Sequence, residues 1–120
     1  LKSDELQLLA QTGFLAVSTG KMVAGRRIFE GILALRPGNQ AARMGLAMSH
    51  YMVDECEQAE QILRELLAED DNYHLARAHL GLTLILAGKR DQALPFLEEA
   101  AKQNDPLFKD MVEELLEHQG

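Results

Sequence analysis

The stretch LAQTGFLAVSTGKMVAGRRIFEGILALRP, residues 9–37, contains the pattern that decides the fold. Gly20, a strong helix breaker, lies within this stretch. Two more turn-forming residues, Asp54 and Gly88, follow it at equal spacing along the chain. The same step aligns small, large apolar and helix-ending residues: Gly13, Ala47 and Gly81; Gly25, Ala59 and Ala93; Phe29, Leu63 and Leu97; Pro37, Asp71 and Asp105. A gap-free repeat of this kind indicates a stack of similar helical units.

The composition also favours an all-α fold, because good helix formers dominate and aromatic residues make up only 5%. Small residues in the repeat allow neighbouring helices to approach closely, and the large ones fill the space between hairpins. We expect helices over 4–18, 22–35, 40–52, 56–68, 73–87, 90–103 and 107–118. The last has an apolar stripe and a charged face, as expected of a helix that caps the open end of a stack.

Charge and cysteine content exclude several classes of function. The net charge is −7 and the sequence has no basic patch, so we expect neither nucleic-acid binding nor attraction to acidic membranes. Cys56 is the single cysteine, which rules out an intramolecular disulfide and a thiolate zinc cluster. No apolar run is long enough to span a bilayer, so we expect no membrane insertion.

The aligned residues resemble the tetratricopeptide repeat (TPR) family, whose unit has about 34 residues with small, aromatic and proline signature positions. The first unit matches best, through Gly13, Gly20, Gly25, Phe29 and Pro37. The resemblance implies one all-α domain over 1–120, with three TPR hairpins stacked in a right-handed superhelix and closed by a capping helix. The repeats would span about 6–39, 40–73 and 74–107, with the capping helix at 107–118.

In the TPR family, the first helix of each hairpin lines a concave surface. The matching inward positions are almost all apolar: Gln7, Ala10, Phe14 and Val17; Ala41, Met44, Met48 and Tyr51; Leu75, Ala78, Leu82 and Ile85. The resemblance therefore implies an apolar groove that binds a protein segment, such as an amphipathic helix. The alternative is that these residues form core, or are covered by the N-terminal segment or the last helix.

Some TPR domains grip a C-terminal carboxylate with Lys, Arg and Asn side chains on these same helices. The corresponding residues here are Ala10, Phe14, Gly45, Leu75 and His79, none of which is Lys, Arg or Asn. A carboxylate clamp is therefore not expected.

The short chain is similar to the small TPR chaperones of bacterial type III secretion. The segment 100–106, Ala-Ala-Lys-Gln-Asn-Asp-Pro, followed by an amphipathic helix, is similar to the needle-subunit chaperones. Ser18-Thr19-Gly20-Lys21 is similar to the translocator chaperones. The resemblance implies a cytoplasmic chaperone that covers an amphipathic helix of a self-assembling subunit, with a second small co-chaperone and a homodimer when no client is bound. The alternative is a general TPR scaffold in another assembly, such as pilus biogenesis.

We expect no enzymatic activity, no cofactor and no metal site. His74 and His79 are five residues apart, whereas helical metal-binding pairs are usually four apart. Cys56 occupies a position for a small packing residue. The sequence has none of the common phosphate-binding, serine hydrolase or zinc protease motifs.

Overall fold

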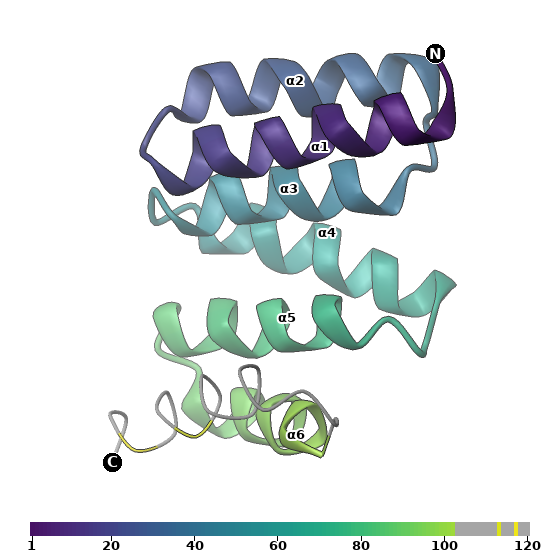
Figure 1. Cartoon of the computed structure of the whole chain (residues 1–120). Helices are drawn as coiled ribbons and strands as arrows, with labels where there is room; N and C mark the ends of the chain where they lie inside the picture. Colours follow the sequence, from purple (N-terminus) through teal and green to yellow (C-terminus); the bar gives the residue numbers. More distant parts are fainter. Residues whose placement is uncertain (103–112, 114–116, 118–120) are drawn as a thin grey trace.

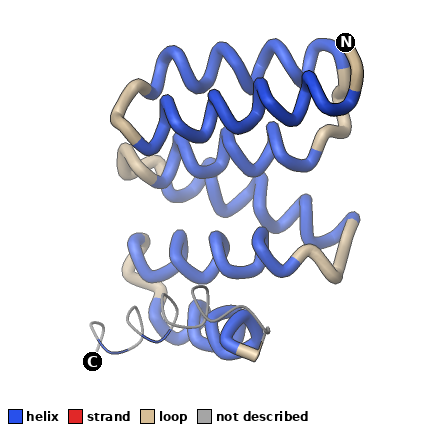
Figure 2. The backbone as a smooth tube through the Cα atoms, viewed as in Figure 1, coloured by secondary structure: helices blue, strands red, loops and turns tan. Residues whose placement is uncertain are grey.

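The computed structural model describes residues 1–102, 113 and 117, and its described elements are helices joined by short loops (Figures 1 and 2). The part of the chain that the structure describes contains six helices: α1 (Ser3–Ser18), α2 (Met22–Leu35), α3 (Gln40–Tyr51), α4 (Cys56–Glu69), α5 (His74–Leu86) and α6 (Arg90–Ala101). Each bound lies within two residues of the one predicted from the sequence. The predicted capping helix 107–118 lies outside the described residues, apart from Glu113 and Glu117.

Consecutive helices pack as three antiparallel hairpins, α1–α2, α3–α4 and α5–α6. The first helix of each hairpin also contacts the first helix of the next, so that α1, α3 and α5 follow one another along the stack (Figure 1). This arrangement confirms the predicted all-α superhelix of TPR hairpins. No helix within the described part of the chain is long and apolar enough to cross a membrane.

In the turn inside each hairpin, the equivalent residues of the sequence repeat share one backbone conformation. Gly20, Asp54 and Gly88 all have positive φ values, of 88°, 66° and 78°. Glycine adopts this left-handed conformation at little cost, and aspartate is among the few other residues that tolerate it. The same turn geometry therefore separates the two helices of every hairpin.

Close helix packing in the first half of the stack depends on the ring of Phe29. This residue of α2 is fully buried, and its ring lies directly over the positions where Gly13 of α1 and Gly45 of α3 lack a side chain. Leu97 of α6 contacts Gly81 of α5 in the same way. The aligned small and large residues thus meet as the repeat pattern predicted.

Arg26 joins the first hairpin to the second. From α2, its guanidinium donates hydrogen bonds to the hydroxyl and the carbonyl oxygen of Ser49 at 2.9 and 3.0 Å, and it pairs with Glu55 at 2.6 Å. Glu55 also lies 2.8 Å from Nδ1 of His50. The hydrogen bonds from His50 and then from Arg26 hold the pKa of the Glu55 carboxyl below its usual value.

Candidate functional site

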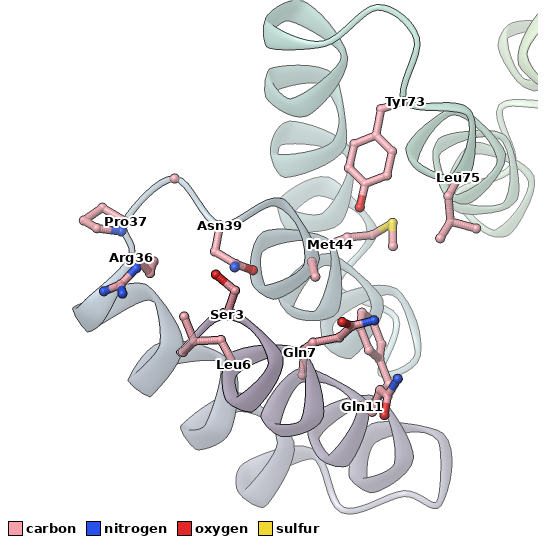
Figure 3. Close-up of a pocket in the computed structure, with 14 residues that line it drawn as sticks. Ser3, Leu6, Gln7, Gln11, Arg36, Pro37, Asn39, Met44, Tyr73 and Leu75 are labelled. Carbon is pink, nitrogen blue, oxygen red and sulfur yellow. The ribbon is translucent and has the colours of Figure 1, made fainter. Parts of the chain in front are cut away.

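A groove of about 780 Å³ opens at one end of the first helices of the three hairpins. Its residues come from α1 between Ser3 and Phe14, from the loop between α2 and α3, from the start of α3, and from the residue before α5 and the start of α5 (Figure 3). The lining residues are Ser3, Leu6, Gln7, Ala10, Gln11, Phe14, Arg36, Pro37, Gly38, Asn39, Ala41, Met44, Tyr73 and Leu75. The groove therefore spans the boundary between successive repeats.

The apolar part of the groove is formed by side chains that the core holds in place. Ala10 and Met44 are buried, and Phe14 packs edge-to-face on Phe29 with ring centroids 5.0 Å apart. Leu75 remains 43% exposed at the far side, and Met44 extends toward it (Figure 3). Such a surface offers apolar contact area to a protein segment at the cost of little rearrangement.

Polar groups line the rim, and most of them carry no charge. Gln7 and Gln11 extend from α1 with their amide groups at the groove (Figure 3), where amides can both donate and accept hydrogen bonds. The Asn39 side chain accepts a hydrogen bond of 2.9 Å from the backbone N–H of Ala42 and so caps α3. Burial raises the pKa of the Tyr73 hydroxyl, which stays a neutral donor and acceptor near neutral pH.

Arg36 is the one charged residue among those lining the groove. Its guanidinium donates hydrogen bonds to the carbonyl oxygens of Leu35 at 3.0 Å and of Leu1 at 3.2 Å. These bonds tie part of the guanidinium to the chain's own backbone. The groove is therefore suited to a largely uncharged segment.

The predicted inward positions lie at different depths. Six of the twelve inward positions are buried: Ala10, Val17, Met44, Tyr51, Ala78 and Ile85. Of the others, Ala41 is half-buried and Gln7 is exposed. Phe14, Met48 and Leu82 are half-buried, and Leu75 is exposed. Of these inward positions, the groove brings together Gln7, Ala10, Phe14, Ala41, Met44 and Leu75. Their predicted role in partner binding stays a prediction.

Several groove residues were not singled out by the sequence. Tyr73 precedes α5, and residues 36–39 form the loop before α3, so neither belongs to the inward pattern of the first helices. Gln11 lies beside the inward positions rather than on them. The sequence signal that could have found Tyr73 is the rarity of tyrosine, with only two in the chain, one of them at a repeat boundary.

The buried end of the inward surface contains a polar pair. The Tyr51 hydroxyl lies 2.8 Å from Nδ1 of His79. Burial raises the pKa of Tyr51 to about 12 and lowers the pKa of His79 to about 4. Both side chains are therefore neutral near pH 7, and a hydrogen bond joins the hydroxyl to the imidazole.

Neither Cys56 nor the histidines form a reactive cluster among the described residues. Burial, and then the charge of Asp54, raise the pKa of the Cys56 thiol, which disfavours the nucleophilic thiolate. Within the same part of the chain, no group of three or more His, Cys, Asp and Glu residues is placed to hold a metal ion.

The sequence pattern of the tetratricopeptide repeat family matches residues 16–83, more than half of the chain. The chain therefore belongs to this family of helical protein-binding scaffolds. A search of curated protein sequences found no significant match.

Solved structures show the same fold. The first TPR domain of Spaghetti (RPAP3), bound to the HSP90 peptide SRMEEVD, is 15% identical with a TM-score of 0.78, and 98% of each chain is covered. The Yersinia enterocolitica type III secretion chaperone SycD, in complex with a peptide of the translocator YopD, is 21% identical with a TM-score of 0.76, covering 98% of this chain and 94% of SycD. PcrH in complex with the chaperone-binding region of PopB is also 21% identical, with a TM-score of 0.75 and coverage of 96% and 94%. Identities this low establish the fold alone.

Proposed function

We propose that this chain is a cytoplasmic chaperone that holds the apolar face of an amphipathic helix from a self-assembling type III secretion subunit. The observation that supports this most directly is the groove itself, with apolar side chains such as Phe14 and Met44 inside and the amides of Gln7 and Gln11 at its rim. Covering the apolar face would keep the client from polymerising before secretion. No catalytic step is needed for this function.

The ordering of the groove favours binding with little loss of entropy. Burial already fixes Met44 in the absence of a partner, so this side chain need not be immobilised on binding. Burial of apolar area contributes roughly 25 cal/mol per Å², before the costs of association. The groove lies next to the Phe29 packing site, so its shape depends on the stability of the first two hairpins.

Two classes of client are supported by different observations. The segment 100–106 is similar to needle-subunit chaperones, which makes a needle subunit our first proposal. The likeness to SycD and PcrH, solved with a YopD peptide and with the chaperone-binding region of PopB, supports a translocator subunit as the second. A general scaffold in another assembly remains the alternative if neither binds.

Co-purification tests the proposal. The tagged chain is co-expressed separately with the needle subunit and with each translocator subunit encoded in the same genome, and the complex is quantified. We expect one class of client to co-purify with the wild-type chain, and Leu75→Glu to reduce binding at least about tenfold by placing a charge in the apolar groove.

Leu86→Glu is the matched control, because Leu86 lies at the opposite end of α5, is 50% exposed and does not line the groove. It should bind client like the wild-type chain. The proposal fails if no secretion subunit co-purifies, or if both variants bind the client as well as the wild-type chain does.

A further inference from the structure

Tyr73 occupies a helix-capping position without capping the helix. In the sequence repeat it is the equivalent of Asn39, and each of the two directly precedes the first helix of a hairpin. The Asn39 side chain accepts a hydrogen bond of 2.9 Å from the backbone N–H of Ala42, whereas the Tyr73 side chain makes no capping bond to α5. Tyrosine is not among the residues that favour this position. A local preference that is given up in this way is typical of a residue that serves binding.

The hydroxyl group of Tyr73 is free to bond to a partner. The half-buried side chain extends into the groove, with its hydroxyl pointing toward Met44 (Figure 3). Within the described part of the chain, no residue forms a hydrogen bond with this hydroxyl. The chain's other tyrosine differs, because the hydroxyl of Tyr51 is bonded to His79. A client that fills the groove would exclude water from the Tyr73 hydroxyl, and a buried hydroxyl without a partner costs free energy.

The surroundings of Tyr73 favour a partner without charge. Asp70 is near enough for its charge to raise the pKa of the Tyr73 hydroxyl further, after burial, so it would also repel a carboxylate of the client. A cationic side chain would have to leave water for an apolar groove, which is costly. The hydroxyl can both donate and accept a hydrogen bond. Serine, threonine, asparagine and glutamine can therefore pair with it without bringing a charge into the groove.

We propose that Tyr73 selects clients whose bound helix carries an uncharged polar residue, Ser, Thr, Asn or Gln, beside its apolar face. This inference rests on the proposed chaperone function and adds a requirement to it. The Tyr73 hydroxyl forms a hydrogen bond with that residue, while the ring contacts the apolar side chains next to it. A client with an apolar residue at this point leaves the hydroxyl buried and unpaired, so it binds about tenfold more weakly.

Calorimetric titration with a client helix tests this selection. The probe is a synthetic peptide of the helix from the secretion subunit that co-purifies, and each of its polar and charged residues is replaced in turn by alanine. Tyr73→Phe should bind the original peptide about tenfold more weakly than the wild-type chain does. One replacement, at an uncharged polar residue, should weaken binding to the wild-type chain about tenfold and have little effect on Tyr73→Phe, because both changes remove the same hydrogen bond.

Tyr51→Phe is the matched control, because it removes a hydroxyl that is bonded inside the chain and does not line the groove. It should lower the midpoint of thermal unfolding by about 2–6 °C. At a temperature where it stays folded, it should bind the peptide like the wild-type chain. Tyr73→Phe should show the reverse, with an unchanged midpoint and a lower affinity.

Three results would overturn the selection by Tyr73. The first is a Tyr73→Phe chain that binds the peptide as tightly as the wild-type chain, and the second is a lowered unfolding midpoint, which indicates a structural role. The third is a coupled client residue that is charged, or no coupled residue at all. In each case the wild-type chain still binds the peptide, so the proposed chaperone function stands. If no secretion subunit binds the wild-type chain, the chaperone function itself is wrong and the selection is wrong with it.

Discussion

A hydrogen bond of 2.8 Å between the hydroxyl group of Tyr51 in α3 and Nδ1 of His79 in α5 joins the second hairpin to the third. Burial lowers the pKa of His79 to about 4, so the imidazole is neutral in the folded chain near pH 7. The unfolded chain binds a proton at this residue near pH 6.5, so it takes up more protons than the folded chain between pH 6.5 and 4. The free energy of unfolding must therefore fall as the pH falls through this window.

We predict a loss of about 2 kcal/mol of stability between pH 7.5 and pH 5 from His79, measured by urea unfolding. His79→Gln keeps a hydrogen-bond acceptor but cannot be protonated in this range, so its stability should vary less with pH. The carboxyl groups of Glu55 and Glu60, whose pKa values lie below normal, lose their stabilising contribution only at lower pH. Equal pH dependence in both proteins would contradict the assignment.

Replacing Gly45 by alanine should destabilise the fold. The added methyl group would meet the ring of Phe29, which is fully buried and has no free space to enter. Overpacking of this kind costs about 1–3 kcal/mol. Gly31→Ala is the control, because Gly31 is exposed in α2 with open space at its side-chain position, and it should stabilise by about 0.5–1 kcal/mol. Thermal and urea unfolding of both variants would measure the contrast.

The turn at Asp54 should become more stable with glycine. Asp54 has a φ of 66°, whereas the equivalent residues in the other hairpins are Gly20 and Gly88. Relief of the left-handed strain should stabilise Asp54→Gly by about 0.5–1 kcal/mol. Gly88→Ala should do the reverse and cost about 1 kcal/mol, and urea unfolding would measure both changes. A destabilised Asp54→Gly variant would show that the carboxylate contributes more than its backbone conformation costs.

The thiol of Cys56 should react slowly in the folded protein. The residue is buried, and burial together with the charge of Asp54 raises its pKa, so little thiolate is present at pH 8. We expect labelling by a disulfide reagent at least about tenfold slower in buffer than in 8 M urea. Equal rates would show that the start of α4 opens readily.

The peptide SRMEEVD, seen with the first TPR domain of Spaghetti, should not bind here. Of the residues lining the groove only Arg36 is cationic, and its guanidinium is bonded to backbone carbonyl oxygens. An acidic peptide would lose hydration without gaining a partner for its carboxylates. Calorimetry at low ionic strength should detect no binding up to millimolar peptide; saturable binding would show that Arg36 is free to act.

Most of the fold was predictable because the residues that determine it are local and recur. Gly20, Asp54 and Gly88 mark the three turns, and the helix bounds follow from them to within two residues. The groove was predicted less well. Met44 and Val17 share the same inward pattern as Leu75, yet the first two are buried and the last is exposed. The helical period gives the direction of a side chain, but its depth depends on how closely the neighbouring helices approach.

The sequence by itself determined the helices, their pairing into hairpins and the contact of small residues with large ones, since each depends on spacing along the chain. The tertiary structure decided where the open surface lies. The packing of α3 against α1 and α5 closes the inward surface around Tyr51 and His79. The loop before α3 and Tyr73 border the part that stays open. Which part of the inward surface stays open depends on distances between residues far apart in the sequence. Such distances are set only when the hairpins stack.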